Sequence, residues 1–314
     1  MDLRNVKKIA VIGAGVMGHS IAQVFAQAAF RVDLVDLKDE LLARGLKLVK
    51  LNLQTLAEYG RIDSGEIPEI LDHIHPTTDL EAAVREADFV LEAVAEIPEV
   101  KRGVFSRLEE ASPEDAILAS NTSSLELFKI IQVRDPSRVV ITHWFAPPHI
   151  IPLVEVVPGP ATDPNVVRFA ANLMERIGKR PLVMEQFVQS FIVNRIQSAI
   201  ALTALGMIKN GWATPEQIDL AVKTSLGIRL PIVGVVQSLD FTGLNLVRDI
   251  LGRDRGLDFP FLEEKVKEGH LGVRTSKGIY DYGGRSEEEI LRKRDLLYLK
   301  MLDFLEGLEA FKPV

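Results

Sequence analysis

The stretch that decides the fold reads Ile9-Ala10-Val11-Ile12-Gly13-Ala14-Gly15-Val16-Met17-Gly18. Four apolar residues in a row predict a buried strand, a glycine-rich turn follows at once, and a segment with helical periodicity comes next. A second apolar run, residues 32–35, ends beside Asp36, which stands 18 residues beyond Gly18. A strand, a G-x-G-x-x-G turn, a helix and an acidic residue at this distance are together typical of a dinucleotide-binding unit.

Each position of this turn meets a separate physical requirement. Gly13 permits the tight turn, Gly15 lets the backbone approach a pyrophosphate, and Gly18 lets the helix pack closely on the strand. The helix N-terminus adds N–H groups and the positive end of a dipole for the phosphates. Asp36 would accept hydrogen bonds from the adenine ribose hydroxyls and repel a 2′-phosphate, which predicts NAD and not NADP as the cofactor.

Composition narrows the class of protein. The chain of 314 residues carries 37 Lys and Arg against 44 Asp and Glu, a net charge of -7, with no basic stripe, so we expect no nucleic-acid partner. It has no cysteine, which excludes disulfides, thiolate nucleophiles and Cys-ligated zinc. No apolar stretch approaches the roughly 18 residues of a membrane span. We therefore expect a cytoplasmic protein with no membrane partner.

The chain divides into two parts by pattern. Up to about residue 185, strand-like and helix-like segments alternate, with further strands expected at residues 89–94, 116–119, 139–142 and 153–157. This alternation predicts an α/β, Rossmann-like fold, in which a mostly parallel sheet has helices on both faces. From about Phe187 onward the strand signals stop. We expect residues 1–186 to form an NAD-binding domain and residues 187–314 an all-α C-terminal domain for substrate binding and dimerisation.

Two helices in the second part begin with capping boxes. Residues 214–217, Thr-Pro-Glu-Gln, open one helix, which Gly227 is expected to end. Ser286 and Glu289 open a long helix with an apolar stripe made of Ile290, Leu297, Met301, Phe304, Leu305 and Leu308. Because these apolar stripes exceed what a small domain buries by itself, we expect a homodimer formed through this part of the chain.

Polar side chains that suit alcohol chemistry lie at the ends of predicted strands. Ser123 follows the strand at 116–119, His143 follows the strand at 139–142, and Glu155 lies on the next strand. A neutral histidine can take a hydroxyl proton, while a carboxylate bonded to its other nitrogen stabilises the imidazolium. His143 and Glu155 are the candidates for these two roles. Ser123 or Asn194 could then hold the substrate oxygen.

Spacing alone leaves structural interpretations of the same residues open. Ser123 and Glu126 match a capping box, so the serine could simply start a helix. A single histidine at a strand end is more often a packed, hydrogen-bonded residue, and Glu155 could pair with an arginine. His73 and His75 would share one face of a strand, but no third ligand is apparent, so we expect no metal site.

Taken together, the motifs resemble the L-3-hydroxyacyl-CoA dehydrogenase family over about residues 5–282. The matching segments are GAGVMG at 13–18, VLEAV at 90–94, SNTSSL at 120–125, LVEV at 153–156, FIVNR at 191–195 and KGIY at 277–280. The resemblance implies that Ser123, His143, Glu155 and Asn194 form the catalytic set, with Ser123 also contacting the substrate.

The same resemblance implies cofactor contacts beyond the glycine turn. These are at Asp36, Glu96 and Lys101, and at Arg274, which stands where the family usually has lysine. The chain departs from the family pattern at three further positions, with Ala146 in place of asparagine and Ser190 and Ser276 in place of glycine.

Other segments bear on the substrate. Residues 53–61 lack the lysines with which CoA-using members of the family hold the CoA phosphates. Residues 147–152 and 225–229, with the long C-terminal helix, resemble the branch that contains L-gulonate 3-dehydrogenase, or lambda-crystallin, and dehydrogenases of free carboxylic acids. In that interpretation Arg229 holds a substrate carboxylate; a surface salt bridge is the alternative.

The predicted function is NAD-dependent oxidation of the 3-hydroxyl of a hydroxy acid or hydroxyacyl thioester, by a His/Glu dyad, with a free acid favoured over a CoA ester. The substrate is then a small molecule. Because Ala146 removes a polar contact, the alternative is an NAD-binding structural protein, crystallin-like, with weak or lapsed catalysis.

Overall fold

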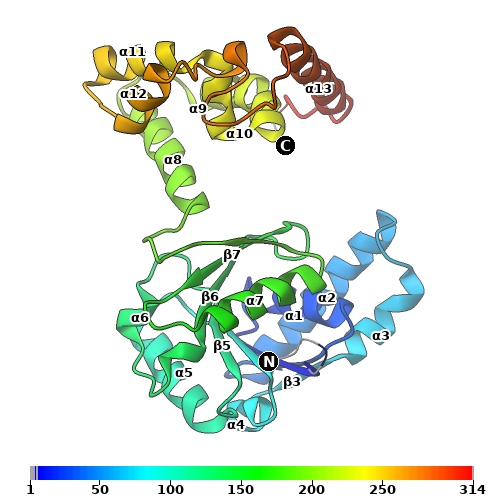
Figure 1. The fold of residues 1–314 in the computed structure, drawn as a ribbon. Coiled ribbons are helices and arrows are strands. Elements are labelled where there is room, and N and C mark those ends of the chain that lie inside the picture. The colour runs from blue at the N-terminus through cyan, green and yellow to red at the C-terminus, as the bar shows by residue number, and fades with distance from the viewer. Residues whose placement is uncertain (1–3, 5, 313–314) are drawn as a thin grey trace. The chain divides into compact units, whose positions relative to one another are not determined.

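The chain divides into two units, residues 1–198 and 199–314, in a computed structural model that describes Arg4 and residues 6–312 (Figure 1). Of Asp254 and Arg255 it describes the backbone alone. The division falls inside helix α8 (Val193–Lys209), whereas the predicted domain boundary lies before that helix, between residues 186 and 187.

An eight-stranded sheet with the order β3-β2-β1-β4-β5-β6-β7-β8 forms the centre of the first unit (Figure 1). All neighbouring strands are parallel except β6 and β7, which run antiparallel. The predicted mostly parallel, Rossmann-like sheet is confirmed. The strands are β1 (Lys8–Ile12), β2 (Arg31–Val35), β3 (Ile74–Thr77), β4 (Phe89–Glu92), β5 (Ile117–Ser120), β6 (Val139–Trp144), β7 (Leu153–Pro158) and β8 (Arg180–Val183).

Helices cover both faces of the sheet because its central strands are apolar on both sides. On β1, Ile9 and Val11 pack into one hydrophobic core, whereas Ala10 and Ile12 pack into a second core on the opposite face. The first core is completed by helices α1 (Gly18–Gln27), α2 (Asp39–Glu58), α3 (Ile67–Asp72) and α7 (Pro164–Arg176). The second is completed by α4 (Leu80–Val84), α5 (Pro98–Ala111) and α6 (Leu127–Ile130).

The two edge strands, β3 and β8, are the ones that the apolar pattern does not reveal. Each contains a proline, Pro76 in β3 and Pro181 in β8. Proline lacks an N–H for the hydrogen-bond ladder and is therefore tolerated at a sheet edge, where one side of the strand needs no partner. Both strands are also half exposed, so they lack the continuous apolar run of a central strand.

The second unit is helical among its described residues. It contains most of α8, then α9 (Pro215–Ala221), the π-helical turn η4 (Val222–Leu226), α10 (Gly227–Thr242), α11 (Leu244–Arg255), α12 (Pro260–Lys267) and α13 (Glu287–Gly307). Thr214 caps α9 in a complete capping box, and Ser286 caps α13, as predicted. The expected helix end at Gly227 is wrong. Its φ of -61° is helical, and the chain passes through the π-helical turn directly into α10.

A buried carboxylate, Asp240, organises the end of the second unit. Its oxygens accept hydrogen bonds from the backbone N–H groups of Ile279 and Tyr280, at 2.8 and 2.9 Å, and from the Tyr282 hydroxyl at 2.9 Å. A Cβ on Gly278 would lie 2.2 Å from the Asp240 carboxylate, so only glycine fits there. The Lys-Gly-Ile-Tyr segment is thus built around Asp240.

Among the described residues, no single helix is long and apolar enough to cross a membrane. By length and composition alone, one sharply bent pair of helical segments, Pro215–Thr242 and Leu244–Arg253, passes such a test jointly.

Candidate active site

The glycine turn lies where the strand order reverses, between β1 and its two neighbours β2 and β4. Gly13 has a φ of +105°, and a Cβ there would lie 2.7 Å from the carbonyl oxygen of Ala93, beyond the end of β4. A Cβ on Gly18 would lie 1.7 Å from the Gly13 oxygen, whereas nothing lies within 4 Å of a Cβ on Gly15. The backbone at Gly15 is therefore open to a ligand at the crevice where α/β sheets bind nucleotides.

The Asp36 carboxylate lies against this turn. Its Oδ2 accepts a hydrogen bond from the Ala14 N–H, and its Oδ1 accepts one from the Leu37 N–H, both at 2.7 Å. Asp36 follows β2 directly and is half-buried. The carboxylate is therefore held in place by backbone donors and keeps acceptor capacity for two ribose hydroxyls.

His143 and Glu155 face each other across the antiparallel pair β6 and β7, as directly opposed residues of the register. The His143 Nδ1 lies 2.8 Å from Glu155 Oε2. The other carboxylate oxygen, Oε1, accepts hydrogen bonds from the backbone N–H groups of Ile192 and Val193, each at 3.0 Å. Both side chains are buried, with 3 % of His143 and 0 % of Glu155 exposed.

Electrostatics favour an ionised Glu155. Burial alone would raise its pKa, but the hydrogen bond from His143 and the two backbone N–H groups outweigh burial and hold the pKa below its usual value. Because a carboxylate can only accept, the His143 Nδ1 must carry a proton, which leaves Nε2 as the acceptor of a neutral ring. Nε2 is not among the buried polar atoms that lack a partner. The Phe145 and Phe191 rings pack against the imidazole, with centroids 4.6 and 5.0 Å away.

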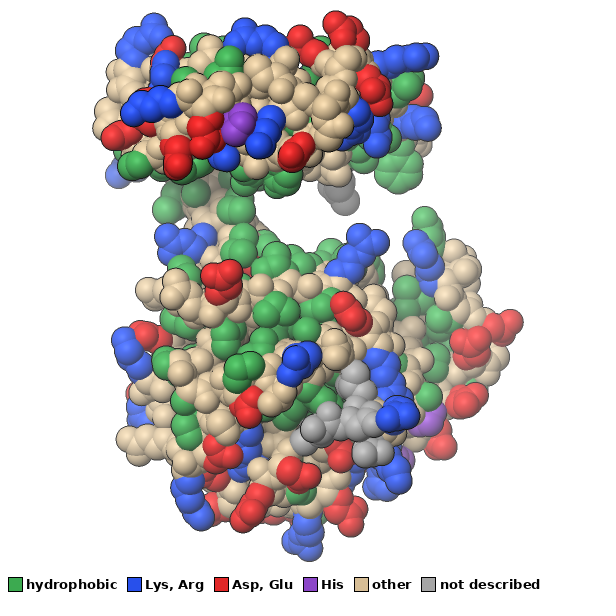
Figure 2. Space-filling model, in the orientation of Figure 1, with side chains coloured by type: hydrophobic (Ala, Val, Ile, Leu, Met, Phe, Trp, Pro, Cys, Tyr) green, Lys and Arg blue, Asp and Glu red, His purple; other side chains and the backbone are tan. Residues whose placement is uncertain are grey.

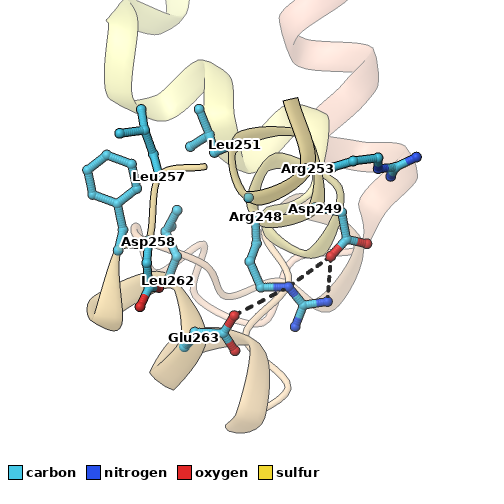
Figure 3. Close-up of a pocket in the computed structure, with 10 residues that line it drawn as sticks. Arg248, Asp249, Leu251, Arg253, Leu257, Asp258, Leu262 and Glu263 are labelled. Atoms are coloured by element: carbon cyan, nitrogen blue, oxygen red, sulfur yellow. Dashed lines mark hydrogen bonds and ion pairs between the residues drawn. The ribbon is translucent and has the colours of Figure 1, made fainter. Parts of the chain in front are cut away.

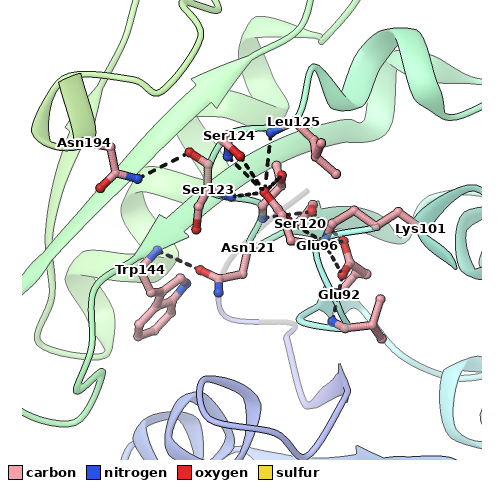
Figure 4. A network of polar contacts seen from close by, with 12 residues as sticks. Glu92, Glu96, Lys101, Ser120, Asn121, Ser123, Ser124, Leu125, Trp144 and Asn194 are labelled. Carbon is pink, nitrogen blue, oxygen red and sulfur yellow. Dashed lines mark hydrogen bonds and ion pairs between the residues drawn. The ribbon is translucent and has the colours of Figure 1, made fainter. Parts of the chain in front are cut away.

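A single carboxylate, Glu96, organises the loop that carries Ser123 (Figure 4). Its Oε1 accepts hydrogen bonds from the Thr122 hydroxyl at 2.7 Å and from the N–H groups of Ser123 and Ser124 at 2.8 and 2.9 Å. Burial opposes ionisation of Glu96, but these donors together with the Lys101 ammonium hold its pKa below the usual value. The loop that carries Ser123 is therefore held by a carboxylate from the connection between β4 and α5.

Lys101 reaches this loop only through carboxylates. Its ammonium is buried, with 1 % of the side chain exposed; it donates to Glu92 at 2.7 and 3.0 Å and lies 3.3 Å from Glu96 Oε2. Glu92 also accepts a hydrogen bond from the Ser120 hydroxyl at 2.6 Å. The structure thus gives Lys101 two carboxylate partners. Glu96 contacts the Ser123 loop directly, and Glu92 contacts it through the Ser120 hydroxyl, which also accepts the Thr122 N–H at 3.1 Å (Figure 4).

Asn194 lies beside the same loop. Its side-chain amide donates to the Ser123 carbonyl oxygen at 3.3 Å (Figure 4). Asn194 directly follows Val193, whose N–H binds Glu155. The Ser123 hydroxyl itself makes no hydrogen bond with another described residue, and α6 begins only at Leu127 with no side-chain cap, so Ser123 does not start that helix. The predicted catalytic set thus forms two hydrogen-bonded pairs, His143 with Glu155 and Asn194 with Ser123, which are connected through the backbone at Val193.

Arg229 and Arg274 belong to the second unit and are exposed there. The Arg229 guanidinium contacts its own helix turn, with Nη2 3.2 Å from the Ser225 hydroxyl and Nε 3.4 Å from the Ser225 carbonyl. Arg274 lies in a short 3-10 turn, Val273–Thr275. Neither guanidinium has a carboxylate within 4 Å among the residues that the structure describes.

The second unit also has a hollow of 450 Å³ between α11 and α12 (Figure 3). Its central cation, Arg248, pairs with Asp249 at 2.7 Å and with Glu263 at 3.7 Å. The hollow contains no predicted site residue, and its central arginine is already paired with two carboxylates.

Sequence reasoning missed several residues on which this geometry depends. Glu92 and Asp240 are buried carboxylates, and an acid inside an apolar strand or helix is itself a signal, because it needs partners when buried. No such signal marks the backbone N–H groups that bind Glu155, at Ile192 and Val193, or the Phe191 ring that packs on His143. These contacts depend on where the chain passes close to the sheet again after β8.

Comparison with known proteins agrees with this geometry. Residues 8–187 match the family "3-hydroxyacyl-CoA dehydrogenase, NAD binding domain", and residues 191–282 match "3-hydroxyacyl-CoA dehydrogenase, C-terminal domain". A probable 3-hydroxybutyryl-CoA dehydrogenase of Bacillus subtilis is 36% identical over 285 residues, which is 88% of this chain and 98% of that protein.

Two further relatives match nearly the whole chain. The 5-formyl-3-hydroxy-2-methylpyridine 4-carboxylate 5-dehydrogenase of Mesorhizobium japonicum is 28% identical over 97% of this chain and 100% of its own length. The crystal structure of a 3-hydroxyacyl-CoA dehydrogenase from Archaeoglobus fulgidus superimposes with a TM-score of 0.78 at 31% identity, covering 96% of this chain and 99% of that one. The chain belongs to the 3-hydroxyacyl-CoA dehydrogenase family and is an NAD-dependent dehydrogenase that acts on a hydroxyl group.

Proposed function

We propose that this dehydrogenase oxidises the 3-hydroxyl of a free hydroxy acid, with His143 as the general base and Glu155 as its partner. The observation that carries the proposal is the cross-strand pair itself, with His143 Nδ1 2.8 Å from Glu155 Oε2 and Glu155 held on its other oxygen by two backbone N–H groups. This arrangement fixes the tautomer that leaves Nε2 free to accept a proton.

In this mechanism the substrate hydroxyl donates its proton to His143 Nε2. The imidazolium that forms is stabilised by the Glu155 carboxylate, which is ionised before the reaction begins. The bound NAD would supply the hydride acceptor for the carbinol carbon. Ser123 and Asn194 orient the substrate oxygen toward His143, and the Glu96 carboxylate holds the Ser123 loop rigid while the oxygen changes charge.

The cofactor would be held by the turn of Gly13, Gly15 and Gly18, by Asp36 at the adenine ribose, and by Glu96 near the Ser123 loop. The open space above Gly15 and the spare acceptors of Asp36 fit a dinucleotide. Lys101 acts here by neutralising Glu92 and Glu96. Arg274 is proposed as a further cofactor contact.

The substrate preference rests on Arg229 and on residues 53–61. Arg229 is exposed and has no acidic partner among the described residues, so it is available for a carboxylate, whereas Arg61 beyond α2 stacks over the Tyr59 ring at 5.7 Å. A charged, bidentate contact is worth about 1.5 to 3 kcal/mol. The Mesorhizobium relative is named for a pyridine carboxylate and not for a CoA ester, which supports a free acid.

The dyad is tested by replacing His143 with alanine. Turnover is expected to fall by roughly 10² to 10⁴, because general-base catalysis is lost, while NAD affinity changes little. The matched control is His75→Ala, which removes an exposed histidine on the edge strand β3. Glu155→Gln should cost less turnover and shift the pH optimum. Near-normal turnover of the His143→Ala enzyme would refute the mechanism.

The substrate is tested with 3-hydroxybutyryl-CoA, free 3-hydroxybutyrate and L-gulonate, followed as NADH absorbance. We expect the free acids to be turned over more efficiently, and Arg229→Met to reduce kcat/KM on them by about one to two decades with little effect on the ester. Arg292→Met, which removes an exposed arginine of α13, is the control. A large preference for the CoA ester contradicts the proposal, and NAD binding without any turnover favours the structural, crystallin-like alternative.

We also propose a cytoplasmic homodimer. A chain that consumes NAD needs a compartment that supplies it, and a cysteine-free chain is compatible with the cytoplasm. The C-terminal part supports the dimer, because α8 has no buried residue and carries apolar side chains on its surface (Figure 2). The most exposed of these are Leu202 and Leu205, at 70 % and 62 %.

A further inference from the structure

The segment of residues 145–152 joins the two strands that carry the dyad, since it leaves β6 just after His143 and enters β7 just before Glu155. Two side chains from elsewhere in the first unit hold it. Ser20, in the first turn of α1, contacts His149, and Lys179, between α7 and β8, contacts two of the segment's carbonyl oxygens.

The contact between Ser20 and His149 is a double hydrogen bond. The Ser20 Oγ lies 2.8 Å from His149 Nδ1 and accepts the His149 backbone N–H at 3.2 Å. Ser20 is buried, with 1 % exposed. A hydroxyl donates one hydrogen bond and can accept two, so the two distances by themselves allow either ring tautomer. In a neutral His149 ring with its proton on Nε2, the Ser20 hydroxyl donates to Nδ1 while it accepts the backbone N–H, and this is the arrangement on which the inference rests.

The surroundings favour the neutral ring. Burial lowers the pKa of His149, and the nearby His19 and Lys179 lower it further. His19 comes from α1, where its Nδ1 lies 2.6 Å from the Gly15 carbonyl oxygen. Lys179 comes from the connection between α7 and β8, and its ammonium donates to the carbonyl oxygens of Pro148 and Ile151, at 2.5 and 2.9 Å.

The contact links two parts of the site that are far apart in sequence. Ser20 stands two residues after Gly18, in the helix that follows the dinucleotide turn, and His149 stands six residues after His143. We propose that His149, acting through Ser20, is a positioning residue that ties the segment between the dyad strands to the dinucleotide-binding helix. The catalytic consequence of this inference rests on the proposed function. The expected effect of His149 on NAD binding is independent of that function.

The position of the segment explains why its anchoring should affect NAD binding. The segment lies beyond the carboxyl end of β6, at the same edge of the sheet as the glycine turn after β1. When the segment is anchored, the surfaces on both sides of the nucleotide crevice are set before NAD arrives. Without the anchor, binding NAD must also order the segment, so affinity falls.

The experiment is a double-mutant cycle with His149→Ala, Ser20→Ala and the double variant. For each protein, the NAD dissociation constant is measured by calorimetry, and kcat is measured at saturating NAD. His149→Ala should weaken NAD binding by about two- to tenfold, the range for one net hydrogen bond, and Ser20→Ala by at least as much, because it also removes the bond from the His149 backbone N–H. The double variant should be no weaker than Ser20→Ala. His149→Asn places an amide oxygen near the position of Nδ1, and should restore binding to within about twofold of the wild type because it is a neutral acceptor.

Three results would overturn the inference: unchanged NAD affinity in His149→Ala, additive losses in the double variant, or a His149→Asn variant as weak as His149→Ala. The asparagine variant also separates anchoring from a general loss of stability, since both substitutions remove the ring's packing. A wild-type protein that binds NAD but oxidises no alcohol would defeat the proposed function, and the cycle on NAD affinity would still decide the role of His149.

Discussion

At the scale of single residues, we expect the carboxylate of Asp36 to determine the choice between NAD and NADP. It is held by the N–H groups of Ala14 and Leu37 at 2.7 Å, so it cannot easily turn away from a 2′-phosphate. Asp36→Ala should therefore raise the KM for NAD and narrow the preference over NADP, because a repulsive charge is lost. The measurement is kcat/KM with each cofactor, and Asp39→Ala, an exposed acid at the start of α2, is the control. A wild-type preference for NADP would contradict the assignment.

Ser276 stands where the family resemblance implies glycine, and its backbone conformation is one that favours glycine. Its φ is +56°, in the left-handed region, and its hydroxyl is buried without a partner. Left-handed backbone costs a non-glycine residue about 1–2 kcal/mol, which exceeds the roughly 0.5–1 kcal/mol that glycine loses in chain entropy.

Ser276→Gly should accordingly stabilise the second unit by about 1 kcal/mol, because it relieves the strain and removes the orphaned hydroxyl. Calorimetric unfolding would show this as a rise of a few degrees in the transition temperature. Ser190, with a φ of +64°, is the comparison, because its hydroxyl is not a buried orphan and Ser190→Gly relieves backbone strain alone. A lower transition temperature for Ser276→Gly would show that the serine makes a compensating contact.

At the scale of elements, the connection between α7 and β8 supplies a buried cation to the segment after β6. Burial lowers the pKa of Lys179 from 10.5 to about 8. Between about pH 8 and 10.5 the folded chain has released this proton while the unfolded chain still holds it. The unfolded state then binds more protons, so the contribution of Lys179 to stability rises with pH through this window and is flat below it.

The wild type should therefore gain stability relative to Lys179→Met between pH 8 and pH 10. Urea unfolding reports this when it is followed by Trp144 fluorescence in a Trp212→Phe background, since the Lys179 ammonium lies 5.4 Å from the Trp144 ring. Groups that titrate in both proteins cancel in the comparison. Parallel stability curves across this range would mean that Lys179 is not desolvated.

At the scale of the whole molecule, the exposed apolar surface of α8 predicts association. Leu202 is 70 % exposed on a helix whose described residues include none that is buried. We expect a dimer by light scattering at micromolar concentration, and Leu202→Glu should shift the protein toward monomer because a charge is then placed in an apolar interface. Gln197→Glu, which adds a charge at a polar position of the same helix, is the control. A monomeric wild type would contradict the dimer.

What could be predicted from the sequence is what depends on near neighbours in the chain. The strand, glycine turn and helix at residues 9–18, the capping box at Thr214, the side-chain cap at Ser286 and the buried central strands all follow from local pattern. The pattern failed where tertiary context outweighed it. Edge position allowed Pro76 and Pro181 in strands, and continuation into α10 overrode the stop signal at Gly227.

The sequence by itself determined the fold class, the family and the cofactor, because each depends on motifs whose members lie within a few residues of one another. Only the tertiary structure decided the partners of the buried charges. Whether Glu155 meets a histidine or an arginine depends on the register of two antiparallel strands, and that register is set where residues 145–152 turn and pack. Lys101 with Glu92, and Asp240 with the backbone of Ile279 and Tyr280, are likewise brought together by folding. A buried charge must find a compensating group in three dimensions, and no local pattern specifies which group lies within reach.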